Sequence, residues 1–182
     1  MTSTTFDIPT LRTLRLTLRA PLRDDFDDYA AMLADPRSAH MGGPFSRRVA
    51  WDFFCNATAQ WQLSGFGGWM IDSDGAWVGE IAIQQPDHFP EPELGWSLKG
   101  EAEGKGYALE AATAALRWYW RRTQSSTLVS YITPGNARSE TLATRLGATL
   151  DPDAQRPDGE TADETAVFRH HRAEQPHAEG WT

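Results

Sequence analysis

Cysteine is nearly absent from this sequence. Cys55 is the only one in 182 residues, so the chain can form neither an intramolecular disulfide nor a zinc site built from several cysteines. A packed core must therefore stabilise the fold, and a chain of this length can bury one. Because Cys55 lies among apolar positions of an expected helix, and no activating motif accompanies it, we interpret it as a packed thiol rather than a nucleophile.

Positive charge and long apolar runs are also scarce. Lys and Arg number 17 against 25 Asp and Glu, which gives a formal net charge of −8. Nucleic-acid binding normally needs a basic face, so no nucleic-acid partner is expected. No apolar run approaches the roughly 20 residues of a membrane span, and the first residues lack the basic and apolar regions of a secretory signal. These absences predict a cytoplasmic protein with no membrane partner.

The chain length and the absence of repeats or a splitting linker predict one domain over residues 1–182, with its core at 11–170 and loose termini at 1–10 and 173–182. Strict alternation of strands and helices would give an all-parallel sheet. The order β-α-α-β-β-β-α-β-α-β-β instead predicts an α+β fold, with a mixed, largely antiparallel sheet of about seven strands and about four helices. Strands are expected at 14–18, 69–71, 77–83, 94–98 and 127–132, with two weaker ones after 147, and helices at 24–36, 46–65, 106–122 and 139–146.

A glycine-rich turn stands between the strand at 94–98 and the long helix that follows. Its two glycines let the backbone turn tightly and approach a ligand, while the helix N-terminus offers unpaired N–H groups and a partial positive charge. Together they predict an anion site suited to a pyrophosphate, although a plain glycine-rich turn is the alternative. The Walker and dinucleotide motifs do not match, because the first needs Ser or Thr at Gly106 and the second needs glycine at Leu109. The turn consists of Glu103, Gly104, Lys105, Gly106, Tyr107 and Ala108.

Around this turn the sequence resembles the GNAT acetyltransferase superfamily, and within it the branch similar to ribosomal-protein N-terminal acetyltransferases. That family's acetyl-CoA motif is Gln or Arg, two residues, Gly, one residue, then Gly or Ala. It maps onto Glu103, Gly106 and Ala108, with Glu103 departing from the pattern. The departure removes a positive side chain but leaves the backbone amides in place.

Three further segments support the resemblance, in the order that the family has them. Residues 11–19 are similar to its first strand, 93–98 to the strand before the motif, and 136–148 to its second cofactor motif. The resemblance therefore spans residues 11–170 and implies a GNAT-like fold.

The resemblance implies that acetyl-CoA donates its acetyl group directly to a primary amine. A neutral amine attacks the thioester, backbone N–H groups near Leu98 stabilise the oxyanion, and CoA thiolate leaves after protonation. By the family's motif, Ser139 supplies that proton and Asn136 contacts the pantetheine arm. A helix N-cap is the alternative role for Ser139, because it stands at an expected helix start. The resemblance also places Trp96, Leu98 and Arg138 beside the cofactor.

A carboxylate is the expected base for the proton of the amine. Glu93, on the strand before the glycine turn, is the favoured candidate, and Glu80, on the preceding strand, is the second. The alternative for each is an outward strand residue solvated at the surface, and for Glu80 this alternative is the favoured one.

A GNAT-like domain that binds acyl-CoA as a sensor or scaffold, without turnover, is the competing hypothesis. Asn136 and Ser139 favour an enzyme, whereas Glu103 favours weaker cofactor binding. The acceptor is left open between a protein N-terminus, an amino acid or polyamine, and an amine-bearing toxin, and the acidic net charge favours a cationic one. No metal is expected, and a homodimer is left open.

Overall fold

The computed structural model describes residues 7–172 of the chain. The loose termini expected at 1–6 and 173–182 lie outside the described residues. Within the remainder of the expected leader, Ile8 packs against the main core. The Pro9 carbonyl accepts a hydrogen bond of 2.8 Å from the indole N–H of Trp69, which attaches the leader to the middle of the sheet.

One eight-stranded sheet organises the described residues, with the strand order β1-β2-β3-β4-β5-β6-β8-β7. Its neighbouring strands are antiparallel except β5 and β6, which run parallel. The mixed, largely antiparallel sheet predicted from the sequence is therefore confirmed. The strands are β1 (Leu11–Arg12), β2 (Leu16–Arg19), β3 (Gly68–Ser73), β4 (Ala76–Gln84), β5 (Glu93–Leu98), β6 (Thr127–Ile132), β7 (Thr149–Leu150) and β8 (Ala166–His171).

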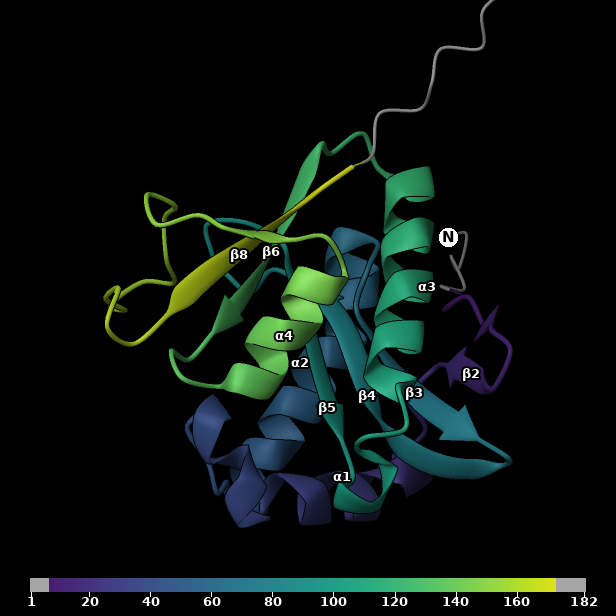
Figure 1. The fold of residues 1–182 in the computed structure, drawn as a ribbon. Coiled ribbons are helices and arrows are strands. Elements are labelled where there is room, and N and C mark those ends of the chain that lie inside the picture. The colour runs from purple at the N-terminus through teal and green to yellow at the C-terminus, as the bar shows by residue number, and fades with distance from the viewer. Residues whose placement is uncertain (1–6, 173–182) are drawn as a thin grey trace, which may run out of the picture.

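Helices cover both faces of the sheet (Figure 1). On one face α3 packs on a core that includes Ile81 and Leu94. On the other face α1 and α2 pack on Met70 and Trp77. No helix within residues 7–172 is long and apolar enough to cross a bilayer. The α-helices are α1 (Phe26–Leu33), α2 (Arg47–Ser64), α3 (Tyr107–Arg122) and α4 (Ala137–Arg145), and the 3-10 helices are η1 (Arg23–Asp25), η2 (Pro36–Met41) and η3 (Gly100–Ala102).

The first predicted strand is shorter than expected. The alternation of Leu14, Leu16 and Leu18 predicted one strand, but Leu14 is 94 % exposed. The chain reverses here, and the Thr13 N–H donates to the Leu16 carbonyl at 3.0 Å, so that Leu11 pairs with Leu18 in a separate strand. The sequence did not reveal this turn, because it contains neither glycine nor proline and the alternation of apolar and polar residues continues through it.

Helix α2 is bounded by the residues that the sequence indicated. The Ser46 hydroxyl accepts a hydrogen bond of 3.3 Å from the Val49 N–H as the N-cap, and Gly65 ends the helix in a left-handed conformation with φ of 78°. Cys55, however, is exposed, so its interpretation as a packed thiol is wrong. It follows the buried Phe54 directly, and on a helix the next residue points about 100° away from the buried stripe.

Candidate active site

Strands β5 and β6 pair at one position and then diverge. Glu93 opposite Val129 is their register pair, and the Val129 N–H donates to the Pro92 carbonyl at 3.1 Å. Figure 1 shows the two strands pointing apart, with α4 in front of them. We call the stretch beyond this pair, residues 94–98 of β5 and 130–132 of β6, the fork. Its backbone groups have no ladder between the two strands, which leaves N–H and C=O groups for other partners.

Backbone N–H groups of β5 point into the fork. The Lys99 N–H donates to the Val78 carbonyl on the other side, at 2.9 Å. In an antiparallel pair, alternate residues direct their peptide groups toward and away from the neighbouring strand. Trp96 and Leu98 therefore direct their N–H groups away from β4 and into the fork. Fixed N–H donors of this kind can stabilise an oxyanion.

The glycine turn connects the end of the fork to the first turn of α3. Gly104 and Gly106 have φ of +73° and +80°, which side chains other than glycine rarely adopt. Gly106 is the N-cap, and its carbonyl accepts the first helical hydrogen bond from Glu110 at 3.1 Å. The N–H groups of residues 107–109 therefore have no helical partner. At the start of a 16-residue helix, they form an arrangement that suits an anion.

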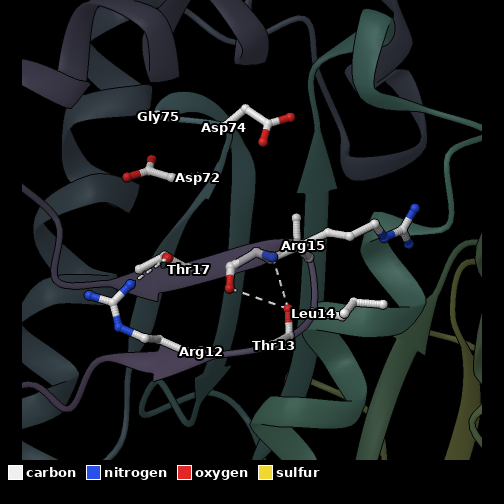
Figure 2. A pocket seen from close by; sticks show the side chains of 9 residues that line it. Arg12, Thr13, Leu14, Arg15, Thr17, Asp72, Asp74 and Gly75 are labelled. Atoms are coloured by element: carbon white, nitrogen blue, oxygen red, sulfur yellow. Dashed lines mark hydrogen bonds between the residues drawn. The ribbon is translucent and has the colours of Figure 1, made fainter.

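Arg15 and Glu110 support the glycine turn from the β1–β2 side. The Arg15 guanidinium donates to the Lys105 carbonyl at 2.8 Å and to Glu110 at 2.7 Å, and the Thr13 hydroxyl donates to Glu110 at 2.6 Å. Figure 2 shows the Arg15 side chain pointing away from Asp72 and toward the green ribbon of α3. Burial raises the pKa of Glu110, but the hydrogen bonds from Thr13 and Arg15 outweigh it and lower the pKa below its ordinary value. Glu110 thus remains charged and holds the turn.

An ion pair connects the glycine turn to α4. Arg138 Nη1 lies 2.5 Å from Glu103 Oε2, and the two side chains are 78 % and 35 % exposed. A pair this exposed contributes about 0–1 kcal/mol to stability. It does place a guanidinium beside the turn, so the negative charge that departs from the family motif is accompanied by a cation from α4.

Asn136, and not Ser139, caps α4. The Asn136 Oδ1 accepts a hydrogen bond of 3.3 Å from the Ser139 N–H, so the alternative N-cap role of Ser139 is wrong. Ser139 is half-buried, and no hydrogen bond found within residues 7–172 uses its hydroxyl. That hydroxyl is therefore available to donate to a ligand.

Glu93 lies where the fork begins, and its carboxylate is buried. The side chain is 9 % exposed, and Gln84 Nε2 donates to it at 3.3 Å. Burial raises its pKa from 4.5 to about 7, against opposing hydrogen bonds from Gln84 and the Tyr131 backbone. Gly95 follows on the same face, and a Cβ there would lie 3.8 Å from the carboxyl carbon, so no side chain covers the carboxylate on that side. A carboxyl group half ionised near neutral pH is well matched to general-base work.

Glu80 lies on the same face, four residues along β4 from the partner of Glu93 and thus roughly 13 Å away. Its Oε1 is buried without a hydrogen-bond partner. A Cβ on Gly68 would come within 2.9 Å of that oxygen and 2.9 Å of Ala57 on α2, so the carboxylate sits beneath α2 rather than at the fork. Burial raises its pKa to about 7, opposed by a hydrogen bond from Tyr29. The solvated surface position is therefore wrong for Glu93, whereas Glu80 is partly exposed with its Oε1 buried.

The sequence did not predict a role for two fork residues, Ser130 and Tyr131, or for His170 on the neighbouring strand β8. The Ser130 hydroxyl donates to the Leu94 carbonyl at 2.7 Å and lies 3.0 Å from His170 Nε2. Burial, followed by the charges of two nearby carboxylates, raises the pKa of Tyr131 to about 12, so this phenol beside Glu93 stays protonated. In the sequence these are ordinary strand residues. Their importance depends on the contact with β5, which is distant in sequence and therefore leaves no pattern among adjacent residues.

Two other kinds of site were sought in the described residues: a metal site and a ligand pocket away from the fork. Within the described part of the chain, no group of three or more His, Cys, Asp or Glu side chains is arranged to hold a metal ion. A hollow of about 310 Å³ lies between the β1–β2 and β3–β4 turns, and it is lined by Arg12, Asp72 and Asp74 among others (Figure 2). It belongs to strands on the far side of β4 from the fork, so it is a separate feature.

Comparisons with known proteins agree with this geometry. Residues 15–149 match the acetyltransferase (GNAT) domain family. The structure is similar to an acetyltransferase from Agrobacterium tumefaciens str. C58, with 44 % identity, a TM-score of 0.86, and coverage of 94 % of this chain and 99 % of that one.

Two more distant structures share the fold. An acetyltransferase of the GNAT family from Bacillus anthracis has 17 % identity and a TM-score of 0.68, covering 88 % of this chain and 96 % of that one. An acetyltransferase from Salmonella typhimurium that modifies the N-terminal serine of ribosomal protein L7/L12 has 16 % identity and a TM-score of 0.70, again covering 88 % and 96 %. At these identities the likeness concerns the fold alone.

Proposed function

Because the chain belongs to the GNAT acetyltransferase family, with acetyl-CoA as the acetyl donor, we propose that it transfers the acetyl group directly to a primary amine. The observation that carries the proposal is the fork, which has a helix N-terminus beyond one end and a buried carboxylate at the other. A cytoplasmic location, where the donor is available, is part of the proposal.

The glycine turn holds the pyrophosphate in this proposal. The N–H groups at the start of α3 face the phosphates, and Lys105 and Arg138 supply positive charge in a protein that is acidic as a whole. The pantetheine arm then runs along β5 toward Glu93, within reach of Asn136. Trp96 and Leu98 direct N–H groups into this path, where they can bind the thioester carbonyl as its oxygen becomes negative.

The chemistry needs one proton acceptor and one proton donor. The neutral amine nitrogen attacks the thioester carbon, a C–N bond forms, and the C–S bond breaks. Glu93 takes the proton that the nitrogen loses, directly or through one water. Ser139 gives its hydroxyl proton to the CoA thiolate and recovers one from solvent.

The two proton-transfer groups lie on different sides of the sheet, which supports a direct transfer. Glu93 shares its face with residues that pack toward α1 and α2, whereas Ser139 belongs to α4 on the opposite face. The acceptor amine therefore approaches from one side and the thiol leaves on the other. Glu80, beneath α2, is outside this path, so we assign the base to Glu93.

A panel of amines tests the proposal. The purified protein is given acetyl-CoA with peptides that begin with serine or alanine, amino acids, polyamines or amine-bearing toxins, and release of CoA thiol is followed. At least one class should give turnover, with N-acetylated product by mass spectrometry. Tight acetyl-CoA binding without turnover on any amine would support the competing hypothesis of a non-catalytic acyl-CoA sensor or scaffold.

A further inference from the structure

A chain of buried hydrogen bonds crosses three strands beside the fork. The Ser130 hydroxyl on β6 lies 2.7 Å from the Leu94 carbonyl on β5 and 3.0 Å from the His170 Nε2 on β8. Ser130 is 1 % exposed and His170 is 2 % exposed. Each polar atom in this chain is therefore shielded from water and depends on the next one.

The direction of the protons follows from counting them. A serine hydroxyl has one hydrogen, and the Leu94 carbonyl can only accept, so Ser130 donates to Leu94. The His170 Nε2 must then carry a hydrogen and donate to Ser130. His170 Nδ1 is left without a hydrogen and has no hydrogen-bond partner. Burial lowers the pKa of His170 to about 4, so the imidazole is neutral at neutral pH and the direction is fixed.

The chain stands at the point where β5 and β6 separate. Glu93 and Val129 form the register pair of the two strands, and Leu94 and Ser130 are the residues that follow them. Beyond this pair the two strands diverge and no further ladder pair joins β6 to β5. The Ser130 side chain bridges the larger separation, and His170 prevents it from rotating away.

We propose that Ser130 and His170 are positioning residues that set the closed end of the fork and so place the thioester carbonyl against the Trp96 N–H. This inference rests on the proposed function, because it assumes that acetyl-CoA occupies the fork. Neither residue touches the reacting atoms. They fix the Leu94 peptide, two residues before Trp96 on the same strand and next to Glu93.

Ser130→Ala tests the inference. It removes the hydroxyl that joins the Leu94 carbonyl to the His170 N–H, and a water molecule in its place would pair with both groups without tying the strands together. We expect kcat to fall roughly tenfold or more, because small misplacement of reacting groups is costly. The acetyl-CoA dissociation constant should change less than about threefold, because the phosphate contacts lie at the glycine turn. The share of CoA released by hydrolysis instead of acetyl transfer should rise.

Conservative variants separate positioning from stability. Ser130→Thr keeps the hydroxyl, and His170→Gln keeps an N–H donor, so both should retain more activity than Ser130→Ala and His170→Leu. The matched control is Tyr119→Phe, which removes another buried hydroxyl, bonded to Ser125 at 3.2 Å near the far end of α3. It should lower the melting temperature without changing kcat or the hydrolysed share.

The outcomes distinguish a failure of the positioning role from a failure of the proposed acetyl-transfer function. If Ser130→Ala and His170→Leu lower the melting temperature as Tyr119→Phe does, yet keep the wild-type kcat and coupling, the positioning role is refuted. If either variant fails to fold, the test moves to His170→Gln, which keeps an N–H donor but not the imidazole ring that places it, and its kcat must then fall more than that of Tyr119→Phe. A wild-type protein that releases no CoA with any amine refutes the proposed function itself.

Discussion

Replacing Glu93 by glutamine separates the two consequences of burying a carboxylate at the fork. Burial raises the pKa from 4.5 to about 7, so ionising the group costs about 3 kcal/mol more in the folded protein than in the unfolded chain. Between these two values the folded state binds more protons than the unfolded state. The free energy of unfolding therefore falls as the pH rises through this window and is level above it.

The stability of Glu93→Gln should lack the part of this fall that Glu93 causes, while the part caused by Glu80 remains. Glutamine keeps the shape of the side chain and carries no charge at any pH. The variant should lose about 3 kcal/mol less stability than the wild type between pH 4.5 and 8. Chemical denaturation at several pH values measures the difference directly.

The kinetic effect of Glu93→Gln should differ from its effect on stability. The wild-type kcat/KM should decline below about pH 7, where the carboxylate becomes protonated. At pH 7 the variant should be slower by roughly 10² to 10⁴, the usual contribution of a positioned base. Its rate should partly recover at alkaline pH, because a free amine with a pKa near 10 then becomes abundant.

Glu80→Gln is the matched control. Burial raises the pKa of Glu80 in the same direction and to a similar value. The stability of Glu80→Gln should therefore differ from that of the wild type with pH in the same way as the stability of Glu93→Gln does. Its pH–rate profile should remain that of the wild type. Loss of the acid limb in Glu80→Gln with its retention in Glu93→Gln would refute our assignment of the base, and stability curves that match the wild type in both variants would refute the reasoning from burial.

Three more substitutions test the cofactor contacts and the proton donor, and a fourth, Gly159→Val, is a control. Gly106→Val should raise the acetyl-CoA dissociation constant steeply, because a β-branched residue rarely adopts φ of +80° and would crowd the backbone that faces the phosphates. The control Gly159→Val, at φ of +85° in the loop before β8, should lower stability but leave the affinity for acetyl-CoA unchanged by calorimetry. Ser139→Ala should lower kcat by roughly 10² with little change in acetyl-CoA affinity, and near-normal steady-state turnover would contradict its role as the acid. Glu103→Gln should tighten acetyl-CoA binding at low salt by removing a negative charge and freeing Arg138, and calorimetry at two salt concentrations should show the gain shrinking as screening increases.

Local sequence patterns predicted the structure correctly where it depends on residues that are adjacent in the chain. Helix α2 is an example, because the capping residue Ser46 and the terminating Gly65 directly flank its helical pattern of apolar residues. The same holds for the turn at Gly104 and Gly106, whose positive φ values are what their lack of a side chain predicts. Each of these features is decided within a few residues of chain.

Predictions failed where a distant segment decides the environment. Periodicity indicated a buried Leu14, but the backbone reverses there to pair with β2. The alternative that made Ser139 a cap overlooked Asn136, an equally good N-cap residue three positions earlier, and the helix begins directly after Asn136. Surface positions were considered for both glutamates, yet α2 covers Glu80 and the start of the fork encloses Glu93.

The sequence was enough to predict the element order after the first strand and the GNAT family, because hydrophobic period, turn residues and helix ends depend on consecutive residues. Tertiary structure alone decided which groups meet at the fork. The parallel contact between β5 and β6 joins Glu93 to Val129, and it brings Ser130 and His170 to the Leu94 carbonyl. Leu94 and His170 are joined through Ser130 only by that packing, which also lowers the pKa of His170. Desolvation and hydrogen-bond partners depend on proximity in space and not on separation along the chain.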